Sequence, residues 1–128
     1  MDRKNYTSGA PWEKIVGYSR AVRIGNILEV SGMTSVQEGI VLHHNDPYLQ
    51  TQEIIKIAQT VIENAGGQLS DVIRTRMYVT DINHWEAIGK AHGEAFADIK
   101  PATTMVEVSR LIDADMLVEI EFTAYLRG

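Results

Sequence analysis

Cysteine is absent from the chain, and basic residues are fewer than acidic ones. Without cysteine the chain can form no disulfide, no thiolate nucleophile and no cysteine metal site. The 12 lysines and arginines against 17 aspartates and glutamates leave a formal net charge of −5 at pH 7. No broad basic surface is therefore available to attract phosphate backbones, which disfavours nucleic acid as a partner.

Long hydrophobic runs are also absent. No window approaches the ~20 apolar residues that a membrane-spanning helix needs, and no apolar segment follows the charged N-terminus. We therefore expect a cytoplasmic protein with no membrane partner. The 128 residues, 45% of them hydrophobic, suffice for one domain with its own core, spanning residues 1–128. Residues 1–14 show no periodicity, and we interpret them as a loose lead-in anchored by Trp12.

Familiar catalytic motifs are missing too. The chain has no Gly-x-Ser-x-Gly nucleophile motif and no phosphate-binding glycine loop. Its four histidines form no i, i+4 pair with a spaced carboxylate, so we expect no metal site. His92 falls on the apolar stripe of an expected helix, which favours a partly buried, hydrogen-bonded histidine.

Hydrophobic periodicity is what the chain does have. Alternation with period two predicts strands, and the pair Gly25-Asn26 is typical of the tight turn of a β-hairpin. On the strand after residue 72, the alternation places Ile73 on the same face as Thr75, Met77 and Val79. The expected strands cover residues 20–24, 27–31, 72–80, 103–109 and 117–126, with a brief one near 39–42.

Two helices are expected between these strands. The first begins with Asp46 as N-cap and Pro47 at the first helical position, carries apolar residues at helical spacing, and ends at Gly66-Gly67. The second is capped by Asn83 and ends before Pro101. The order of hairpin, helix, strand, helix, strand, strand predicts an α+β fold with two helices on one face of a mixed sheet.

The other face of this sheet is expected to be uncovered by helices. Aromatic and β-branched side chains accompany its charges, which favours contact with other subunits, so we hypothesise an oligomer formed through this face. Opposite charges on neighbouring strands would pair across it. The polar and aromatic side chains expected there are Arg74, Arg76, Tyr78, Glu119, Glu121 and Tyr125.

Glu119 is the first candidate for chemistry on the uncovered face. Partial burial in an oligomer would disfavour its charged form and raise its pKa toward values useful for proton transfer near neutral pH. An ordinary surface glutamate, or one paired with Arg74 or Arg76, is the more common outcome for such a pattern. Ser31 and Gly32 could offer a hydroxyl and a backbone N–H to a ligand, although strand ends use such residues routinely.

Several stretches resemble the RidA/YjgF family of enamine and imine deaminases, over nearly the whole chain from about Ile15 onward. The resemblance implies a chorismate-mutase-like α+β fold that forms a homotrimer with a central β-barrel and with ligand clefts between subunits. It implies hydrolysis of 2-aminoacrylate-like intermediates with release of ammonia, without a metal or an organic cofactor. The family also carries an endoribonuclease label. The matching stretches are residues 17–22, 25–26, 30–32, 71–81, 101–108 and 118–121.

The resemblance also assigns roles to particular residues. The acid that handles protons matches Glu119, the cleft tyrosine matches Tyr18, and the strand-end pair matches Ser31 and Gly32. Deaminase members have Pro-Ala-Arg where this chain has Pro-Ala-Thr ending at Thr103. The Thr103 hydroxyl cannot form the charge-assisted hydrogen bonds by which an arginine binds a substrate carboxylate, and their loss costs ~1.5–3 kcal/mol of binding free energy.

A second polar contact of the family is missing as well, since its helix asparagine falls on Gly89 of this chain. Arg76, and less strongly Arg20, could replace the missing cation, although solvated arginines are the more ordinary interpretation. Three functions stay open: an imine or enamine hydrolase with altered specificity, a non-catalytic metabolite-binding trimer, and an endoribonuclease. The acidic charge disfavours the third.

Overall fold

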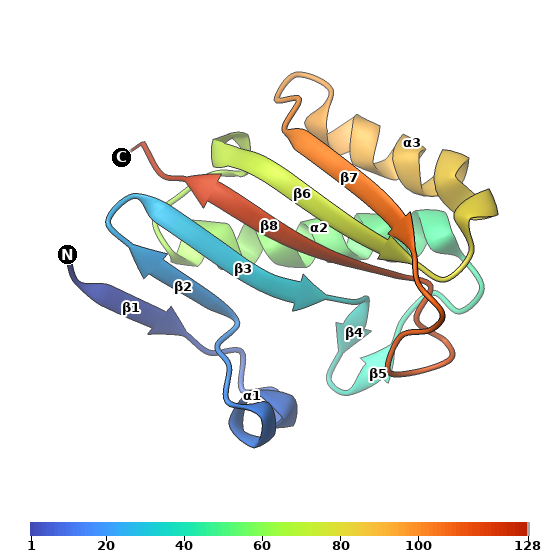
Figure 1. The fold of residues 1–128 in the computed structure, drawn as a ribbon, viewed down its shortest axis with the longest axis horizontal. Helices are drawn as coiled ribbons and strands as arrows, with labels where there is room; N and C mark the ends of the chain where they lie inside the picture. Colours follow the sequence, from blue (N-terminus) through green and yellow to red (C-terminus); the bar gives the residue numbers. More distant parts are fainter. Residues whose placement is uncertain (128) are drawn as a thin grey trace.

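The computed structural model describes residues 1–127, which form a six-stranded sheet and a separate two-stranded one (Figure 1). The large sheet has the order β1-β2-β3-β8-β6-β7, in which only β6 and β7 are parallel neighbours. Its strands are β1 (Arg3–Tyr6), β2 (Ala21–Ile24), β3 (Ile27–Met33), β6 (Val72–Val79), β7 (Ala102–Glu107) and β8 (Val118–Tyr125). The remaining elements are α1 (Pro11–Val16), β4 (Val36–Gln37), β5 (Ile40–Val41), α2 (Pro47–Asn64), η1 (Leu69–Asp71), η2 (Ile82–His84) and α3 (Trp85–Phe96).

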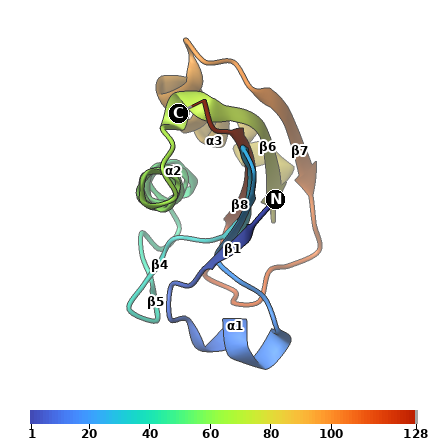
Figure 2. The same ribbon diagram turned by 90° about the vertical axis from the view of Figure 1, so that its left-hand side faces the viewer.

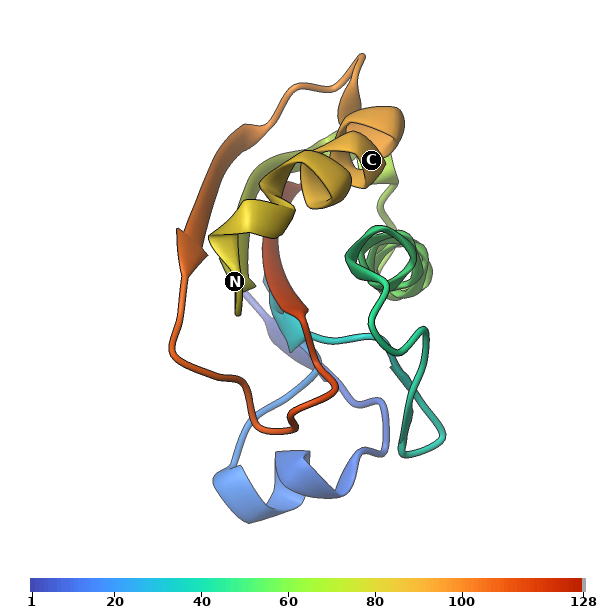
Figure 3. The ribbon, with the colours of Figure 1, turned by 90° about the vertical axis from the view of Figure 1, so that its right-hand side faces the viewer.

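The strand order explains why α2 and α3 share one face. Strands β3 and β6 both run antiparallel to β8, and β7 runs parallel to β6, so the connections through α2 and α3 step across the sheet in one direction. Right-handed crossovers of this kind place both helices on the same side. The edge-on views show this side and, opposite it, a sheet face that α2 and α3 leave open (Figure 2, Figure 3). The expected α+β architecture is confirmed.

The core lies between this helical layer and the sheet. On β8 the side chains of Val118, Ile120, Phe122 and Ala124 are at most 1% exposed, as their alternation predicts. From α2, Ile54, Ala58 and Ile62 meet them and are fully buried. The side chains between the buried ones on β8 therefore point to the open face.

The expected hairpin and first helix are confirmed. Strands β2 and β3 pair around the Gly25-Asn26 turn, with Ile24 opposite Ile27. The Asp46 side chain accepts a hydrogen bond from the Leu49 N–H at 2.9 Å, which caps α2, and Pro47 occupies its first position. No helix within residues 1–127 has the length and apolar character needed to cross a membrane.

The expectation of a loose lead-in over residues 1–14 is wrong. Strand β1 pairs antiparallel with β2, and α1 follows it, with the Glu13 side chain buried beneath. The Glu13 carboxylate accepts hydrogen bonds from the Thr7 and Ser8 hydroxyls and from the Ser8 N–H, and this network organises the segment. Trp12 is not its anchor, because half of its surface is exposed.

Two local expectations are also wrong. Ile73 is 50% exposed because the pairing of β6 with β8 shifts between Val72 and Arg74, which turns Ile73 out of the alternation. Asn83 does not cap α3; the Asp81 side chain accepts from the Asn83 N–H and caps the short helix η2 that precedes α3.

A buried glutamine fixes the start of β8. The Gln50 side chain, fully buried on α2, donates to the carbonyls of His43 and Asp115 at 3.1 and 2.8 Å and accepts from the Leu117 N–H at 2.9 Å. Its amide is thus fully engaged with backbone groups, as a buried polar group requires. The contact holds the chain two residues before Glu119 against the helical layer.

Candidate functional site

Glu119 lies on the open face of β8, directly opposite Tyr78 on β6. Its carboxylate packs against Gly32 on the other neighbouring strand, β3, so closely that a Cβ built on Gly32 would lie 2.6 Å from Oε2. The pairing of β3 with β8 is irregular between Val30 and Met33, which brings Gly32 to this position. Only glycine leaves room for the carboxylate as it stands.

The surroundings of Glu119 disfavour its charged form. Burial raises the pKa of the Glu119 carboxyl above its ordinary value, the Arg20 guanidinium partly opposes that rise, and the Glu121 carboxylate adds to it. The net direction of this pKa shift is upward. Such a carboxyl exchanges protons closer to neutral pH than an exposed glutamate does.

Arg20 lies beside Glu119 on the same part of the open face. Its Nη2 donates to the Gly32 carbonyl at 3.3 Å, and its guanidinium carbon is 5.8 Å from the centre of the Tyr18 ring. Its Nε is buried and has no hydrogen-bond partner within the described chain. Tyr18, Arg20, Gly32 and Glu119 therefore form one cluster, which we call the Glu119 cluster.

Ser31 adjoins this cluster, but its donors are already used. Its hydroxyl donates to the Ser19 carbonyl at 2.7 Å, and its backbone N–H donates to the Arg20 carbonyl at 3.0 Å. The Ser31 hydroxyl proton and the Ser31 N–H are therefore engaged within the chain. The hydroxyl oxygen can still accept a hydrogen bond from a ligand.

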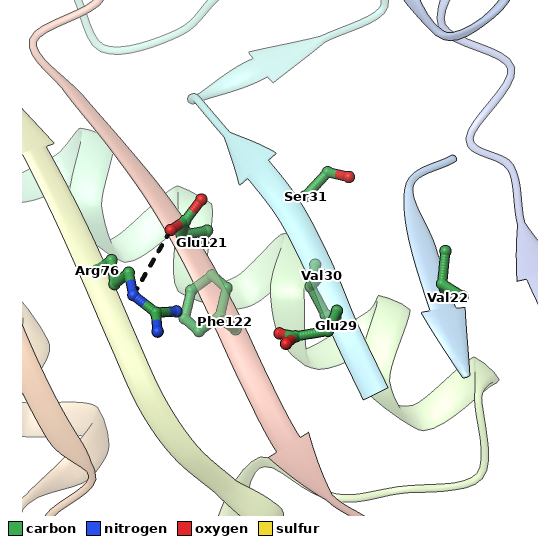
Figure 4. A pocket seen from close by; sticks show the side chains of 7 residues that line it. All are labelled: Val22, Glu29, Val30, Ser31, Arg76, Glu121 and Phe122. Atoms are coloured by element: carbon green, nitrogen blue, oxygen red, sulfur yellow. Dashed lines mark ion pairs between the residues drawn. The ribbon is translucent and has the colours of Figure 1, made fainter. Parts of the chain in front are cut away.

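Arg76 lies farther along the face, in a hollow of about 310 Å³ (Figure 4). Its Nε is 3.8 Å from Oε1 of Glu121, which also accepts a hydrogen bond from the Tyr78 hydroxyl at 2.9 Å. The Glu121 contact is the main reason that the pKa of Tyr78 is raised. Arg76 is therefore an ion-paired strand residue, and the expected pairing of charges across β6 and β8 is confirmed.

A second hollow of about 470 Å³ lies where the N-terminal segment meets the sheet. Tyr18, Ser19 and Ser31 line it together with Arg3 of β1 and Lys14 of α1. Sequence reasoning missed Arg3 and Lys14 because it assigned no structure to residues 1–14. Glu119 lines neither hollow.

Thr103 and Gly89 lie away from the Glu119 cluster. The Thr103 hydroxyl contacts the Thr75 hydroxyl at 2.8 Å, and Thr75 in turn contacts Nε2 of His92 at 2.9 Å. Thr75 is fully buried, so this chain of contacts belongs to the helical side of the sheet. Burial lowers the pKa of His92 below its ordinary value, which agrees with a buried, hydrogen-bonded histidine. Gly89 lies one turn before His92 on α3.

One chain thus unites Glu119, Tyr18, Ser31 and Gly32 but leaves Thr103 and Gly89 elsewhere. Arg76 shares the first hollow with Ser31, where it is paired with Glu121. Within residues 1–127, no group of three acidic or histidine side chains is placed to hold a metal ion. The arrangement provides a proton-exchanging carboxyl and a cation with a free donor, which suit acid–base chemistry on a small polar molecule.

The matching family model is described as Endoribonuclease L-PSP and covers residues 8–126, so the chain belongs to this family, also known as RidA/YjgF. A RutC family protein from Pyrococcus abyssi is 35% identical over 94% of both chains. The 3-aminoacrylate deaminase RutC from Acinetobacter baylyi is 32% identical over 85% of this chain and 86% of its own.

Solved structures agree with this assignment. A member of the YjgF/YER057c/UK114 family from Mycobacterium tuberculosis matches with a TM-score of 0.89 and 43% identity, over 98% of this chain and all of the other. The YjgF gene product from E. coli matches with a TM-score of 0.81 and 26% identity, over 96% and 94% of the two chains. The fold is therefore that of the YjgF family.

Proposed function

We propose that this protein hydrolyses reactive imines and enamines and releases ammonia. The observation that carries the proposal is the half-buried Glu119 carboxyl, whose pKa is raised and which lies beside Gly32 and Arg20. The relationship to a 3-aminoacrylate deaminase at 32% identity supports the same reaction class. The family's endoribonuclease description is disfavoured for this chain by its net charge of −5.

In the proposed reaction, protonated Glu119 first gives its proton to the enamine carbon, which yields the iminium ion and leaves Glu119 as the carboxylate. Water then attacks the carbon of the C=N bond: its oxygen forms the new C–O bond, and Glu119 takes one proton from it. Glu119 returns this proton to nitrogen, the C–N bond breaks, and ammonia leaves as the C=O group forms. The remaining hydroxyl proton passes to Glu119 and restores its protonated form. Water is the only co-reactant, and atoms and charge balance.

We propose that the complete site lies between subunits of a homotrimer. One chain places Glu119, Tyr18, Ser31 and Gly32 together, whereas Thr103 and Gly89 lie on another part of the molecule, so a neighbouring subunit is needed to join the two sets. The exposed apolar side chains Ile27, Val106 and Tyr125 support an interface through the open sheet face.

The oligomer has a direct test. Light scattering coupled to size exclusion should give a mass of about 43 kDa, three times the 14.3 kDa of the chain, since closed symmetry favours such an assembly. Replacing Val106 by Lys should lower this mass, because a charge would be buried at the interface. A monomer at micromolar concentration for the wild type would contradict the trimer.

Turnover is tested with a panel of imines formed in situ from amino acids by an oxidase, together with imines that lack a carboxylate. We expect ammonia release above the spontaneous rate for at least one of them, with a substrate range that differs from that of enzymes with arginine in place of Thr103. No acceleration for any imine, together with specific binding of the products, would instead favour a non-catalytic metabolite-binding protein.

A further inference from the structure

We propose that Arg20 holds the carboxylate of the substrate and thereby selects imines and enamines that carry an anionic group. This inference rests on the proposed function, because it assigns the specificity of the same site. Arg20 would thus supply the cation that the chain lacks at Thr103. It would do so from just before β2, with its guanidinium bonded to Gly32, against which the Glu119 carboxylate packs.

The contacts of Arg20 support this role. Nη2 is held by the Gly32 carbonyl at 3.3 Å, and the guanidinium lies 5.8 Å from the Tyr18 ring, so two contacts fix its position. Its Nε is buried without a partner in residues 1–127. A buried donor without a partner is costly, and a ligand oxygen would satisfy it. A guanidinium binds a carboxylate in a fork of two hydrogen bonds.

The other arginines of the open face are less suited. Arg76 is paired with Glu121 at 3.8 Å, and Nη2 of Arg74 donates to the Thr104 hydroxyl at 2.6 Å. The Nε of Arg74 also lacks a partner, but Arg74 lies opposite Thr123, toward the far end of β8 from Glu119. Among these three, only Arg20 opposes the rise in the pKa of Glu119 with its positive charge.

The position of Arg20 also links binding to proton transfer. Its positive charge opposes the rise in the pKa of Glu119 that burial causes. A bound carboxylate would neutralise this charge, so the pKa of Glu119 would rise further when substrate enters. Glu119 would then be protonated in the presence of an anionic ligand, which is the form that donates a proton to an enamine.

The test uses stable product analogues, so that it does not depend on turnover. Calorimetric titration of the wild type with 2-oxobutyrate and with the neutral 1-hydroxy-2-butanone should show a preference for the anion. Arg20→Gln should weaken 2-oxobutyrate binding roughly tenfold or more and leave the neutral ketone unaffected, since charge-assisted hydrogen bonds are lost. Arg20→Lys should restore part of the affinity, and Arg74→Gln, the matched control, should bind like the wild type.

Thermal melts of each variant establish that it is folded before binding is compared. Equal affinity of wild type and Arg20→Gln for 2-oxobutyrate, a wild type without preference for the anion, or an equal loss in Arg74→Gln would overturn the inference. If Arg20 governs binding but no imine is hydrolysed, the inference stands and the proposed function fails. If imino acids are hydrolysed equally well by Arg20→Gln, the proposed function stands and the inference fails.

Discussion

Replacing Glu119 by Gln should lower the rate of ammonia release by about 10²–10⁴-fold, the range that positioned proton transfer contributes to catalysis. The amide has nearly the same shape and can still pack against Gly32, but it cannot take a proton from water or return one to nitrogen. The measurement is the initial rate of imine hydrolysis, corrected for the spontaneous reaction, at saturating substrate where the affinity change does not enter.

Glu121→Gln is the matched control, because Glu121 lies on the same face of the same strand. Its carboxylate contacts the Tyr78 hydroxyl at 2.9 Å and Arg76 at 3.8 Å, whereas the side-chain atoms nearest a Cβ on Gly32 are those of Glu119. We expect this variant to keep most of the activity. Equal losses in both variants, or none in Glu119→Gln, would show that proton transfer does not depend on Glu119.

The Glu119→Gln variant should be more stable than the wild type at neutral pH. The pKa of Glu119 is raised by folding, so the folded state favours the protonated form, and ionising this carboxyl costs stability. That cost is absent below the ordinary pKa of a glutamate, grows as pH rises, and is complete above the folded pKa. Thermal melts of Glu119→Gln and wild type should therefore coincide in acid and separate at neutral pH, with the variant melting higher.

The sequence predicts the fold where one face of an element is buried. The alternation on β8 and the apolar stripe of α2 are direct consequences of packing these two elements together, so their pattern is sufficient. The N-terminal segment gave no such signal. Its strand β1 is an edge strand whose side chains are mostly exposed, and α1 has six residues organised around the Glu13 carboxylate. Neither leaves a periodic pattern.

The candidate site shows the same limit. Alternation correctly places Glu119 on the open face, but its neighbours depend on how strands pair, and pairing between β3 and β8 contains an irregularity that no local pattern signals. For this reason the contact with Gly32 and the position of Arg20 emerged only from the structure. Arg76, the stronger candidate for the missing cation on the family resemblance, is instead paired with Glu121.

Replacing Gly32 by Ala should reduce activity strongly while the protein stays folded. The new Cβ would lie 2.6 Å from Oε2 of Glu119, which is the far end of a flexible side chain, so the carboxylate can move aside at small cost in stability. That movement takes the carboxylate out of place by about 1 Å, and misplacement of this size costs on the order of 10²-fold in rate. Initial rates and thermal melts of the same preparation provide the measurement.

Gly93→Ala is the control for the effect of adding a methyl group. Gly93 lies on α3, and a Cβ built there meets no atom within 4 Å. Because alanine is the better helix former, this variant should gain about 0.5–1 kcal/mol in stability and keep its activity. A Gly32→Ala protein with full activity would mean that the observed position of Glu119 against Gly32 is not the one that transfers protons. A Gly32→Ala protein that fails to fold would mean that Gly32 is needed for the packing of β3 against β8. Titration of 2-oxobutyrate into the folded Glu119→Gln variant would then show whether the site binds its ligand without the Glu119 carboxylate.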